Sequence, residues 1–275
     1  MSPRAERRKV IRVRGARVDN RPDTIAVEEP LEIRVNQDPV AVTMRTPGDD
    51  FELAVGFLLS EGTLSTPDEL AGVRYCDDGR PDPTKNIVDV TVRGDAAHVA
   101  HRQHTVSSSC GLCGRDSLDQ VRISARWRLD EDDTRVDVRL VGQLPERLRE
   151  GQAVFERTGG IHAAGLFTPT GELLVLREDV GRHNAVDKVI GWALMQGRLP
   201  VRGSVLQVSS RLSFELVQKA WLAGIPVISG VSAPSTLAVD LAAEAGMGLA
   251  GFVRGDSLNV YAATHRFAGL VGEGD

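Results

Sequence analysis

Short apolar runs alternate with amphipathic stretches through the second half of the chain, and this alternation restricts the fold more than any other feature of the sequence. We expect strands and helices to follow one another over residues 205–208, 212–223, 226–229, 235–245, 249–253 and 258–262, after an amphipathic helix over 184–195. Strands joined by helices require crossover connections, which place helices on both faces of a sheet. The pattern therefore predicts a three-layer α/β domain with a largely parallel sheet.

The first half of the chain has the pattern of a smaller domain. Residues 31–35 and 40–44 alternate apolar and polar side chains around a turn, which predicts a hairpin. A helix with an acidic start is expected over 51–60, and a further strand over 87–92. We therefore predict a small α+β domain over residues 1–105 that begins with a basic, mobile N-terminal arm.

A loop is predicted between these two patterns. Residues 106–117 are small and lack any core-forming periodicity, so we expect a loop there. The α/β domain would then cover residues 118–275. It would open with a helix over 145–157, because proline suits a first helical position, and continue with strands over 161–167 and 172–177.

Bulk composition excludes several classes of protein. The 275 residues include 33 basic and 38 acidic side chains, a net charge of -5, so no overall positive charge indicates a nucleic acid or an anionic membrane as partner. No apolar run is long enough for a signal-peptide core or a membrane span, and we expect a cytoplasmic protein. The three cysteines, an odd and sparse set, do not form a disulfide framework.

Cys110 and Cys113 form a C-x-x-C pair in the predicted loop, and three interpretations compete for it. Inert cysteines are usually buried, which a glycine-flanked loop does not favour. Zinc would need two more ligands, from Cys76 and a histidine, without a second C-x-x-C unit to supply them. A redox or sulfur-relay thiol fits best, because a flexible loop beside Arg115 favours access and the thiolate form.

Three predicted strand ends carry serine, glycine and arginine. Ligands of open parallel sheets bind beyond the carboxyl ends of the strands, where helix N-termini present free N–H groups. The segments 177–184, 209–211 and 229–235 leave three such ends, and Arg182 and Arg211 could neutralise phosphate oxygens. Turns and helix caps explain any one of these segments equally well. Their convergence predicts a site for an anionic ligand.

Four motifs in this order resemble the formate dehydrogenase accessory sulfurtransferases, the FdhD/NarQ family. They are Ser109-Cys110-Gly111-Leu112-Cys113-Gly114, Thr158-Gly159-Gly160-Ile161-His162-Ala163-Ala164, the run from Glu178-Asp179-Val180-Gly181-Arg182-His183-Asn184 to Lys188, and Ser209-Ser210-Arg211-Leu212-Ser213. The resemblance implies a sulfur carrier that takes persulfide sulfur from a cysteine desulfurase. It would pass this sulfur to the bis-molybdopterin guanine dinucleotide form of the molybdenum cofactor, before the cofactor enters apo formate dehydrogenase.

The same resemblance implies roles for individual residues and a cytidine-deaminase-like fold for the second domain. Cys110 and Cys113 would be catalytic, with the persulfide on Cys110. The client cofactor would be bound by the strand-end residues, and the segment 251–256 would close one side, an assignment that rests on its place at a predicted strand end. The predicted binding residues are Asp179, Arg182, His183, Ser209, Ser210, Arg211, Ser232, Ser235, Gly251, Phe252, Val253, Arg254, Gly255 and Asp256.

Deamination itself is not expected. Zinc deaminases carry H-x-E at one helix start and P-C-x-x-C at the next. The corresponding positions here read His183-Asn184-Ala185 and Ser209-Ser210-Arg211-Leu212, which lack the glutamate and both cysteines, so no metal site is predicted there. The alternative function is a non-catalytic chaperone that binds the molybdenum cofactor, with a zinc or structural cysteine site. The sequence leaves open whether a second copy of the chain is a further partner.

Overall fold

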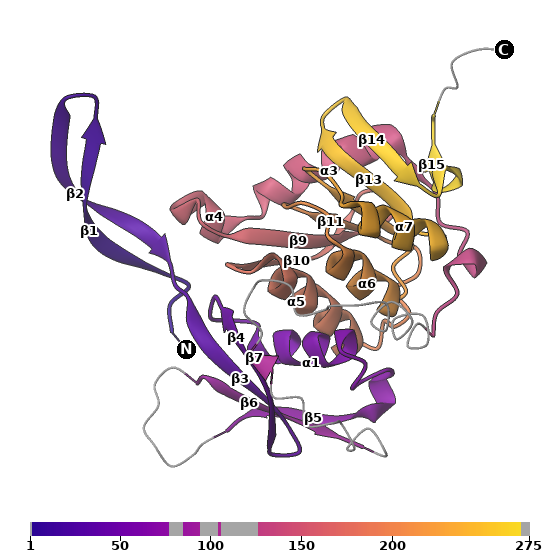
Figure 1. Cartoon of the computed structure of the whole chain (residues 1–275), viewed down its shortest axis with the longest axis horizontal. Coiled ribbons are helices and arrows are strands. Elements are labelled where there is room, and N and C mark those ends of the chain that lie inside the picture. The colour runs from indigo at the N-terminus through magenta and orange to yellow at the C-terminus, as the bar shows by residue number, and fades with distance from the viewer. Residues whose placement is uncertain (1, 77–84, 94–103, 106–125, 271–275) are drawn as a thin grey trace.

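A mixed sheet of six strands forms the centre of the larger part of the protein (Figure 1). The computed structural model describes residues 2–76, 85–93, 104–105 and 126–270. Within these residues the strand order is β10-β9-β11-β12-β13-β14. The strands are β9 (His162–Phe167), β10 (Leu173–Asp179), β11 (Val205–Val208), β12 (Val227–Gly230), β13 (Gly248–Arg254) and β14 (Ser257–Ala262).

The expectation of a largely parallel sheet is wrong. Only the β11–β12 and β12–β13 pairs are parallel, whereas β10–β9, β9–β11 and β13–β14 are antiparallel. The cause is the length of the connections, because short turns join β9 to β10 and β13 to β14, and such turns permit only antiparallel pairing. Gly255, with φ at 53°, lies in the second of these turns. Helical crossovers join β10 to β11 through α5, β11 to β12 through α6 and β12 to β13 through α7, where the sequence predicted helices.

Helices cover both faces of this sheet, which gives the three layers that the alternation predicted. On one face α3 (Val138–Glu150) buries Val141, Leu144 and Leu148 against strand side chains such as Phe167 and Val205. On the other face lie α5 (Arg182–Met195), α6 (Phe214–Leu222) and α7 (Thr236–Glu244), packed on the alternate strand residues. Successive residues of each strand therefore point into the two hydrophobic layers on opposite faces of the sheet.

The predicted helix over 145–157 is wrong in its start and in its continuity. The structure has α3 over Val138–Glu150, with Pro145 inside it, and a separate α4 over Ala153–Thr158. Proline costs one intrahelical hydrogen bond. Two contributions offset this cost: the burial of the apolar stripe of α3, and the cap at Asp137, whose carboxylate accepts a hydrogen bond from the Arg139 N–H at 2.7 Å.

The first half of the chain forms a second sheet with one helix packed on it. Its strands, in the order β5-β6-β3-β4-β7, are β5 (Leu70–Tyr75), β6 (Ile87–Val92), β3 (Glu29–Val35), β4 (Asp38–Arg45) and β7 (His104–Thr105). The helix is α1 (Asp50–Ser60). The predicted hairpin, helix and strand of this half are confirmed.

Helix α1 joins the two halves by crossing α5 at close range. A Cβ on Gly56 would lie 1.9 Å from the Asp187 carbonyl oxygen, and one on Gly191 would lie 1.8 Å from the Glu52 carbonyl oxygen. Two glycines therefore bring the helix backbones into contact. One hydrophobic cluster continues from β3 through α1 and α5 to β11. The division into two domains at 106–117 stays a prediction.

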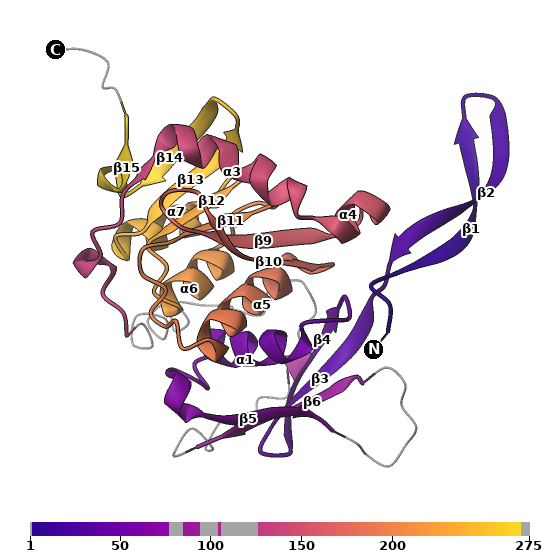
Figure 2. The same cartoon turned by 180° about the vertical axis from the view of Figure 1, so that it is seen from behind.

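The N-terminal arm is a long antiparallel hairpin rather than the expected mobile segment. It consists of β1 (Ala5–Arg14) and β2 (Arg17–Ala26), and it projects from the body in both views of Figures 1 and 2. An ion pair between Arg4 and Asp49 fastens its base, and the Val27 N–H donates to the Arg4 carbonyl oxygen at 3.0 Å. Across the described part of the chain, no helix has the length and apolar character needed to span a bilayer.

Candidate functional site

A cavity of about 770 Å³ opens at one end of the larger sheet. β10, β11, β12 and β13 end there and β9 begins there, because β9 runs antiparallel to its neighbours. The strand-end residues lining the cavity include Ser209, Val253, Arg254 and Gly255, and α3 and α4 form the opposite wall. Four residues predicted from strand ends thus meet in one cavity, as expected for ligand sites of α/β sheets.

Cationic and aromatic groups line this cavity. The guanidinium of Arg149 stacks on the Phe155 ring at 4.3 Å from its centroid, and Arg254 is exposed at the rim. Gly159 and Gly160 present backbone with no side chain above it. The Ser209 hydroxyl accepts a hydrogen bond from the Ala163 N–H at 2.9 Å. Guanidinium groups, a hydroxyl and accessible backbone are the groups that bind phosphate, and a stacked aromatic suits a nucleobase.

His162 lies in the cavity wall with an altered pKa. Its Nδ1 is 3.5 Å from the Ser209 hydroxyl oxygen. Burial lowers the pKa of His162, and the positive charges of Arg182 and His183 lower it further. The ring is therefore neutral at pH 7, so it contributes a hydrogen bond rather than a charge to the cavity. The sequence motif containing His162 gave no indication of this role.

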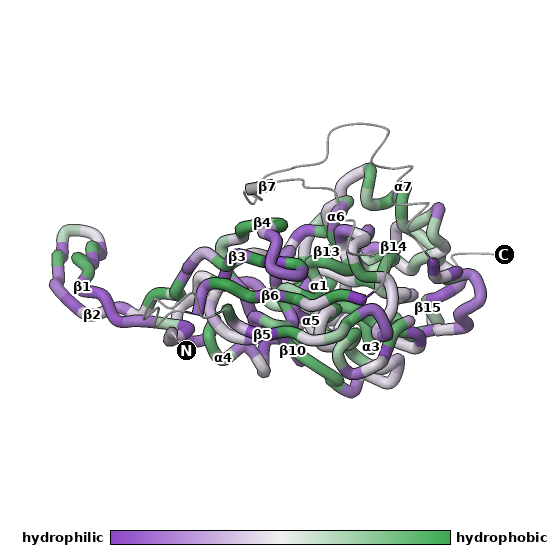
Figure 3. Tube along the Cα trace, turned by 90° about the horizontal axis from the view of Figure 1, so that it is seen from below, coloured by the Kyte–Doolittle hydropathy of each residue, from purple (hydrophilic) through white to green (hydrophobic). Residues whose placement is uncertain are grey.

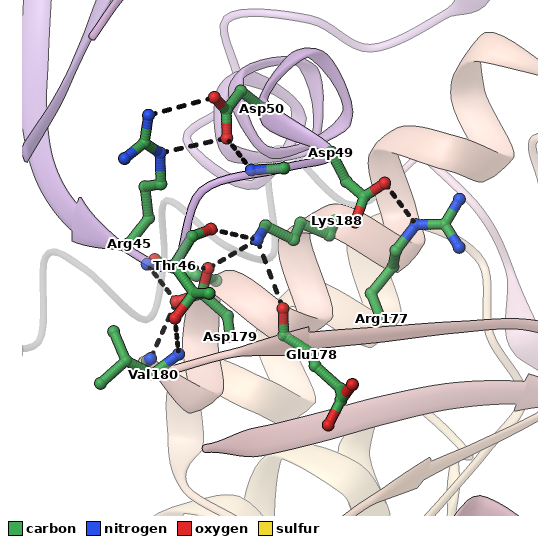
Figure 4. Close-up of polar contacts among 12 residues, drawn as sticks. Arg45, Thr46, Asp49, Asp50, Arg177, Glu178, Asp179, Val180 and Lys188 are labelled. Carbon is green, nitrogen blue, oxygen red and sulfur yellow. Dashed lines mark hydrogen bonds and ion pairs between the residues drawn. The ribbon is translucent and has the colours of Figure 1, made fainter. Parts of the chain in front are cut away.

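Asp179 is fully buried beside the cavity, and its carboxylate is occupied by the protein itself (Figure 4). It pairs with the Lys188 ammonium at 2.7 Å, and both side chains have no exposed surface. It also accepts hydrogen bonds from the Thr46 N–H at 3.1 Å and from the Gly181 N–H at 2.8 Å. With these partners, Asp179 connects the end of β10 to the loop after β4.

The rest of the long motif in α5 has the same connecting function. The Asn184 amide donates to the Met44 carbonyl oxygen at 2.7 Å. Asp187 accepts from the Ser60 hydroxyl at 2.8 Å and pairs with Lys219 at 2.8 Å. These side chains are buried and link the first half of the chain to the second. Most of the motif therefore builds the junction between the halves, and only its start borders the cavity.

A second buried ion-pair network fixes the start of α1, and the sequence did not indicate it. The fully buried Arg45 guanidinium pairs with Asp50 at 3.1 Å and with Glu29 at 3.1 Å. The Tyr75 hydroxyl also donates to Asp50 at 3.1 Å, and burial together with this carboxylate raises the pKa of Tyr75. The network holds α1, β4 and β5 together within the first half of the chain.

Glu178 positions one wall of the cavity. Its buried carboxylate accepts hydrogen bonds from the Val154 N–H at 2.9 Å and the Phe155 N–H at 2.8 Å, the free donors at the start of α4. Phe155 lines the cavity. The sequence placed Glu178 at a strand end, but only the structure shows that it orients the helix carrying the aromatic ring.

The remaining predicted residues are distributed around the cavity without lining it. His183 Nε2 lies 3.4 Å from the Ser213 hydroxyl and 3.8 Å from the Glu215 carboxylate, and this histidine is the main cause of a Glu215 pKa lowered to about 2. Ser235 caps α7 by accepting from the Ala238 N–H. Among the described residues, those predicted but outside the lining are Asp179, Arg182, His183, Ser210, Arg211, Ser232, Ser235, Gly251, Phe252 and Asp256.

The predicted catalytic pair, Cys110 and Cys113, lies outside the described residues. The third cysteine, Cys76, follows β5 and is half-buried, and its N–H donates to the Ile87 carbonyl oxygen at 3.0 Å. No group of three or more metal-ligating side chains is found within the described ranges.

Comparison with known proteins places the chain in a family. The FdhD/NarQ family profile matches residues 26–268, and the chain belongs to this family. A protein of Streptomyces avermitilis named sulfur carrier protein FdhD is 58% identical over 269 residues, which cover 96% of this chain and 95% of that protein. A protein of the same name from Sulfurisphaera tokodaii is 46% identical over 264 residues, covering 95% and 97% of the two chains.

One solved structure supports the fold. A crystal structure from Desulfotalea psychrophila, described as a candidate formate dehydrogenase accessory protein, matches with a TM-score of 0.77. The match covers 96% of this chain and 100% of that one, at 24% sequence identity. The arrangement of mixed sheets and helices is therefore shared with that protein.

Proposed function

We propose that the protein is a cytoplasmic sulfur carrier required for formate dehydrogenase activity. It takes persulfide sulfur from a cysteine desulfurase and passes it to bis-molybdopterin guanine dinucleotide before that cofactor enters the apo enzyme. One observation supports this proposal most directly. Two proteins named sulfur carrier protein FdhD are 58% and 56% identical to this chain over nearly its full length, and the chain contains the Cys110/Cys113 pair. A cytidine-deaminase-like arrangement of the second domain remains part of the proposal.

The two cysteines divide the chemistry between them. The Cys110 thiolate attacks the outer sulfur of the desulfurase persulfide, the S–S bond breaks, and the desulfurase leaves as its thiolate. Release of that sulfur as sulfide needs two electrons. The Cys113 thiolate supplies them by attacking the inner sulfur of Cys110, which forms a Cys110–Cys113 disulfide and frees hydrosulfide for the molybdenum of the client cofactor. A cellular dithiol then reduces the disulfide.

The cavity is our proposed site for the nucleotide part of the client cofactor. Its volume, about 770 Å³, lies within the range of small-molecule sites. Arg254 and Ser209 would bind phosphate oxygens, and Phe155 with its stacked Arg149 would accept the base. The other strand-end residues, including Asp179, Arg182 and His183, would position these groups without touching the ligand.

Mass spectrometry tests the carrier mechanism. After incubation with a cysteine desulfurase and cysteine, we expect the Cys113→Ala variant, which cannot resolve the persulfide, to gain one sulfur atom, located on the peptide that contains Cys110. Cys76 is the internal control, because it is a half-buried thiol at a strand end and should stay unmodified. Sulfur on Cys76, or on no cysteine, would contradict the proposal. Stoichiometric zinc that is lost when Cys110 and Cys113 are replaced would favour the chaperone alternative.

Calorimetry with GDP and ADP tests the nucleotide site in the full chain. Arg254→Ala should weaken GDP binding by about 1.5–3 kcal/mol, because it removes a charge-assisted contact to phosphate. Arg139→Ala, an exposed arginine of α3 outside the cavity lining, is the control and should leave the affinity unchanged. Loss with Arg211→Ala instead of Arg254→Ala would move the phosphate site to the segment 209–211. Equal affinity for GDP and ADP would remove the guanine preference, which rests on the family resemblance.

A further inference from the structure

A buried side-chain amide in the wall of the cavity has no hydrogen-bond partner among the described residues. Within the same residues, Gln152 Nε2 and Arg182 Nε are the buried side-chain nitrogens without a partner. Gln152 lines the cavity with 4% of its surface exposed, whereas Arg182 lies outside the lining. Unpaired buried donors lower stability and are rare in native proteins. The Gln152 amide is therefore a candidate group for binding a ligand.

The backbone holds Gln152 in a fixed place between two other cavity residues. Its N–H donates to the Arg149 carbonyl oxygen at 3.2 Å, and its carbonyl oxygen accepts from the Glu156 N–H at 3.0 Å. Arg149 and Phe155, whose side chains stack, lie three residues before and after it. Figure 3 shows that α4, which begins after Gln152, lies at the end of the body nearest the arm. The amide is thus buried beside the stacked pair, at the margin of the body.

The amide itself can turn although its backbone is fixed. The last side-chain torsion of glutamine has a broad energy profile, so rotation about this bond exchanges the places of nitrogen and oxygen. A turn of the Gln152 amide therefore presents N–H donors to a ligand in the cavity, and these donors then gain a partner.

Other uncharged polar groups of the lining already contact one another. The Ser209 hydroxyl accepts from the Ala163 N–H at 2.9 Å and lies 3.5 Å from His162 Nδ1. Gln152 differs from them, because its donor has no partner in the described part of the chain. It also lies beside Phe155, the ring that we propose as the support for the base.

Stacking alone does not identify a base. Every nucleobase has a π-face, so Phe155 and Arg149 would accept any of them. Hydrogen bonds to the edge of the base supply the identity, and amide side chains form such bonds in pairs. Guanine presents the O6 acceptor next to the N1–H donor, and an amide presents N–H next to C=O. The two groups therefore match in two hydrogen bonds.

We propose that Gln152 binds the edge of the guanine base of the client cofactor, with Nε2 donating to O6 and Oε1 accepting from N1–H. This inference rests on the nucleotide site proposed above and names the side chain that contacts the base edge there. The ligand supplies the partner that the buried donor lacks within the described chain. Stacking on Phe155 holds the plane of the base, and Gln152 fixes its rotation within that plane.

Calorimetry on the full chain tests this assignment. Gln152→Met keeps the length of the side chain and removes the amide, so the dissociation constant for GDP should rise at least about tenfold through the loss of two hydrogen bonds. The constant for inorganic pyrophosphate, which has no base, should stay within about twofold. The matched control is Gln143→Met, an exposed glutamine of α3 outside the cavity lining, and it should leave GDP binding within about twofold.

A change in the ligand identifies the atoms involved. The diphosphate of 2-aminopurine riboside lacks both O6 and N1–H, so the wild-type protein should bind it about tenfold more weakly than GDP. Gln152→Met should cause no further loss with this ligand, because the contact is already absent. Inosine diphosphate retains both groups and should show the same loss as GDP. Equal losses with GDP and the 2-aminopurine ligand would overturn the proposed pairing.

Thermal unfolding without nucleotide distinguishes ligand binding from a structural role. The Tm of Gln152→Met should be unchanged or higher, because methionine removes an unpaired buried donor. A Tm lower by more than about 4 °C would show that the amide stabilises the fold, and would overturn the inference.

The calorimetric outcomes also separate this inference from the proposed function. GDP binding that Arg254→Ala weakens and Gln152→Met leaves unchanged overturns the role of Gln152 and keeps the nucleotide site. A wild-type protein that does not bind GDP overturns both. The sulfur-carrier proposal is tested independently, by persulfide formation on Cys110.

Discussion

Cys110→Ala should abolish the activation of formate dehydrogenase in cells that lack their own carrier, if the proposed function holds. The variant loses the thiolate that accepts the sulfur, and in the proposed mechanism Cys113 only resolves the persulfide and Cys76 stays unmodified. Its fold should be intact, because the sequence predicts a loop at this thiol, and a thiol in a loop would contribute to chemistry and not to the core. The readout is formate-dependent dye reduction in extracts, together with unchanged thermal unfolding and unchanged GDP binding of the purified variant.

Two comparisons make this result specific. Cys113→Ala should have a milder or equal effect, because it removes only the thiol that resolves the persulfide. Cys76→Ala is the matched control, since it deletes the same atom from a half-buried position after β5, and activity should persist. Full activity of Cys110→Ala would show that the carrier mechanism is wrong. A loss in all three variants would indicate a general requirement for thiols instead.

Most helices and strands could be predicted because each depends on local pattern. The alternating run from residue 205 onward gave the strands β11 to β14 and the helices between them within a few residues. The direction of the strands was not predicted correctly, because it depends on the length of each connection and on which neighbours pair. β9 pairs with β11, a strand about forty residues further along, and no local signal specifies that contact.

The lining of the cavity was predicted in part for the same reason. The strand ends at 209 and 253–255 could be inferred to meet, because parallel neighbours end at one edge of a sheet. The roles of Asp179 and Glu178 could not be inferred, since Asp179 bonds Thr46, 133 residues earlier, and Glu178 bonds the start of α4, 23 residues earlier. A motif rich in charged residues suggested ligand binding. The structure shows instead that Asp179 pairs with Lys188 inside the motif and that Asp187 pairs with Lys219 outside it.

Lys188→Met should lower the free energy of unfolding by about 3–5 kcal/mol, the typical loss when one partner of a buried ion pair is removed. The Lys188 ammonium lies 2.7 Å from Asp179, and neither side chain has exposed surface. It also donates to the Thr46 carbonyl oxygen at 3.0 Å. Methionine retains the hydrophobic stem but leaves the Asp179 carboxylate buried without its counter-charge. Urea unfolding at pH 7, followed by circular dichroism, measures the difference.

Two controls identify the cause of that loss. Arg128→Met removes one partner of an exposed pair, with Arg128 and Asp130 70% and 61% exposed, and should change stability by less than about 1 kcal/mol. The double variant Lys188→Met/Asp179→Asn should recover part of the loss. It removes the unpaired carboxylate charge at position 179 and keeps a side-chain carbonyl oxygen that can accept from the Thr46 N–H. The loss of unfolding free energy in the double variant is compared with the sum of the losses in Lys188→Met and Asp179→Asn. If the two are equal, the Lys188 and Asp179 side chains are not coupled energetically. The junction between α5 and the first half of the chain then depends on packing at Gly56 and Gly191, and not on this ion pair.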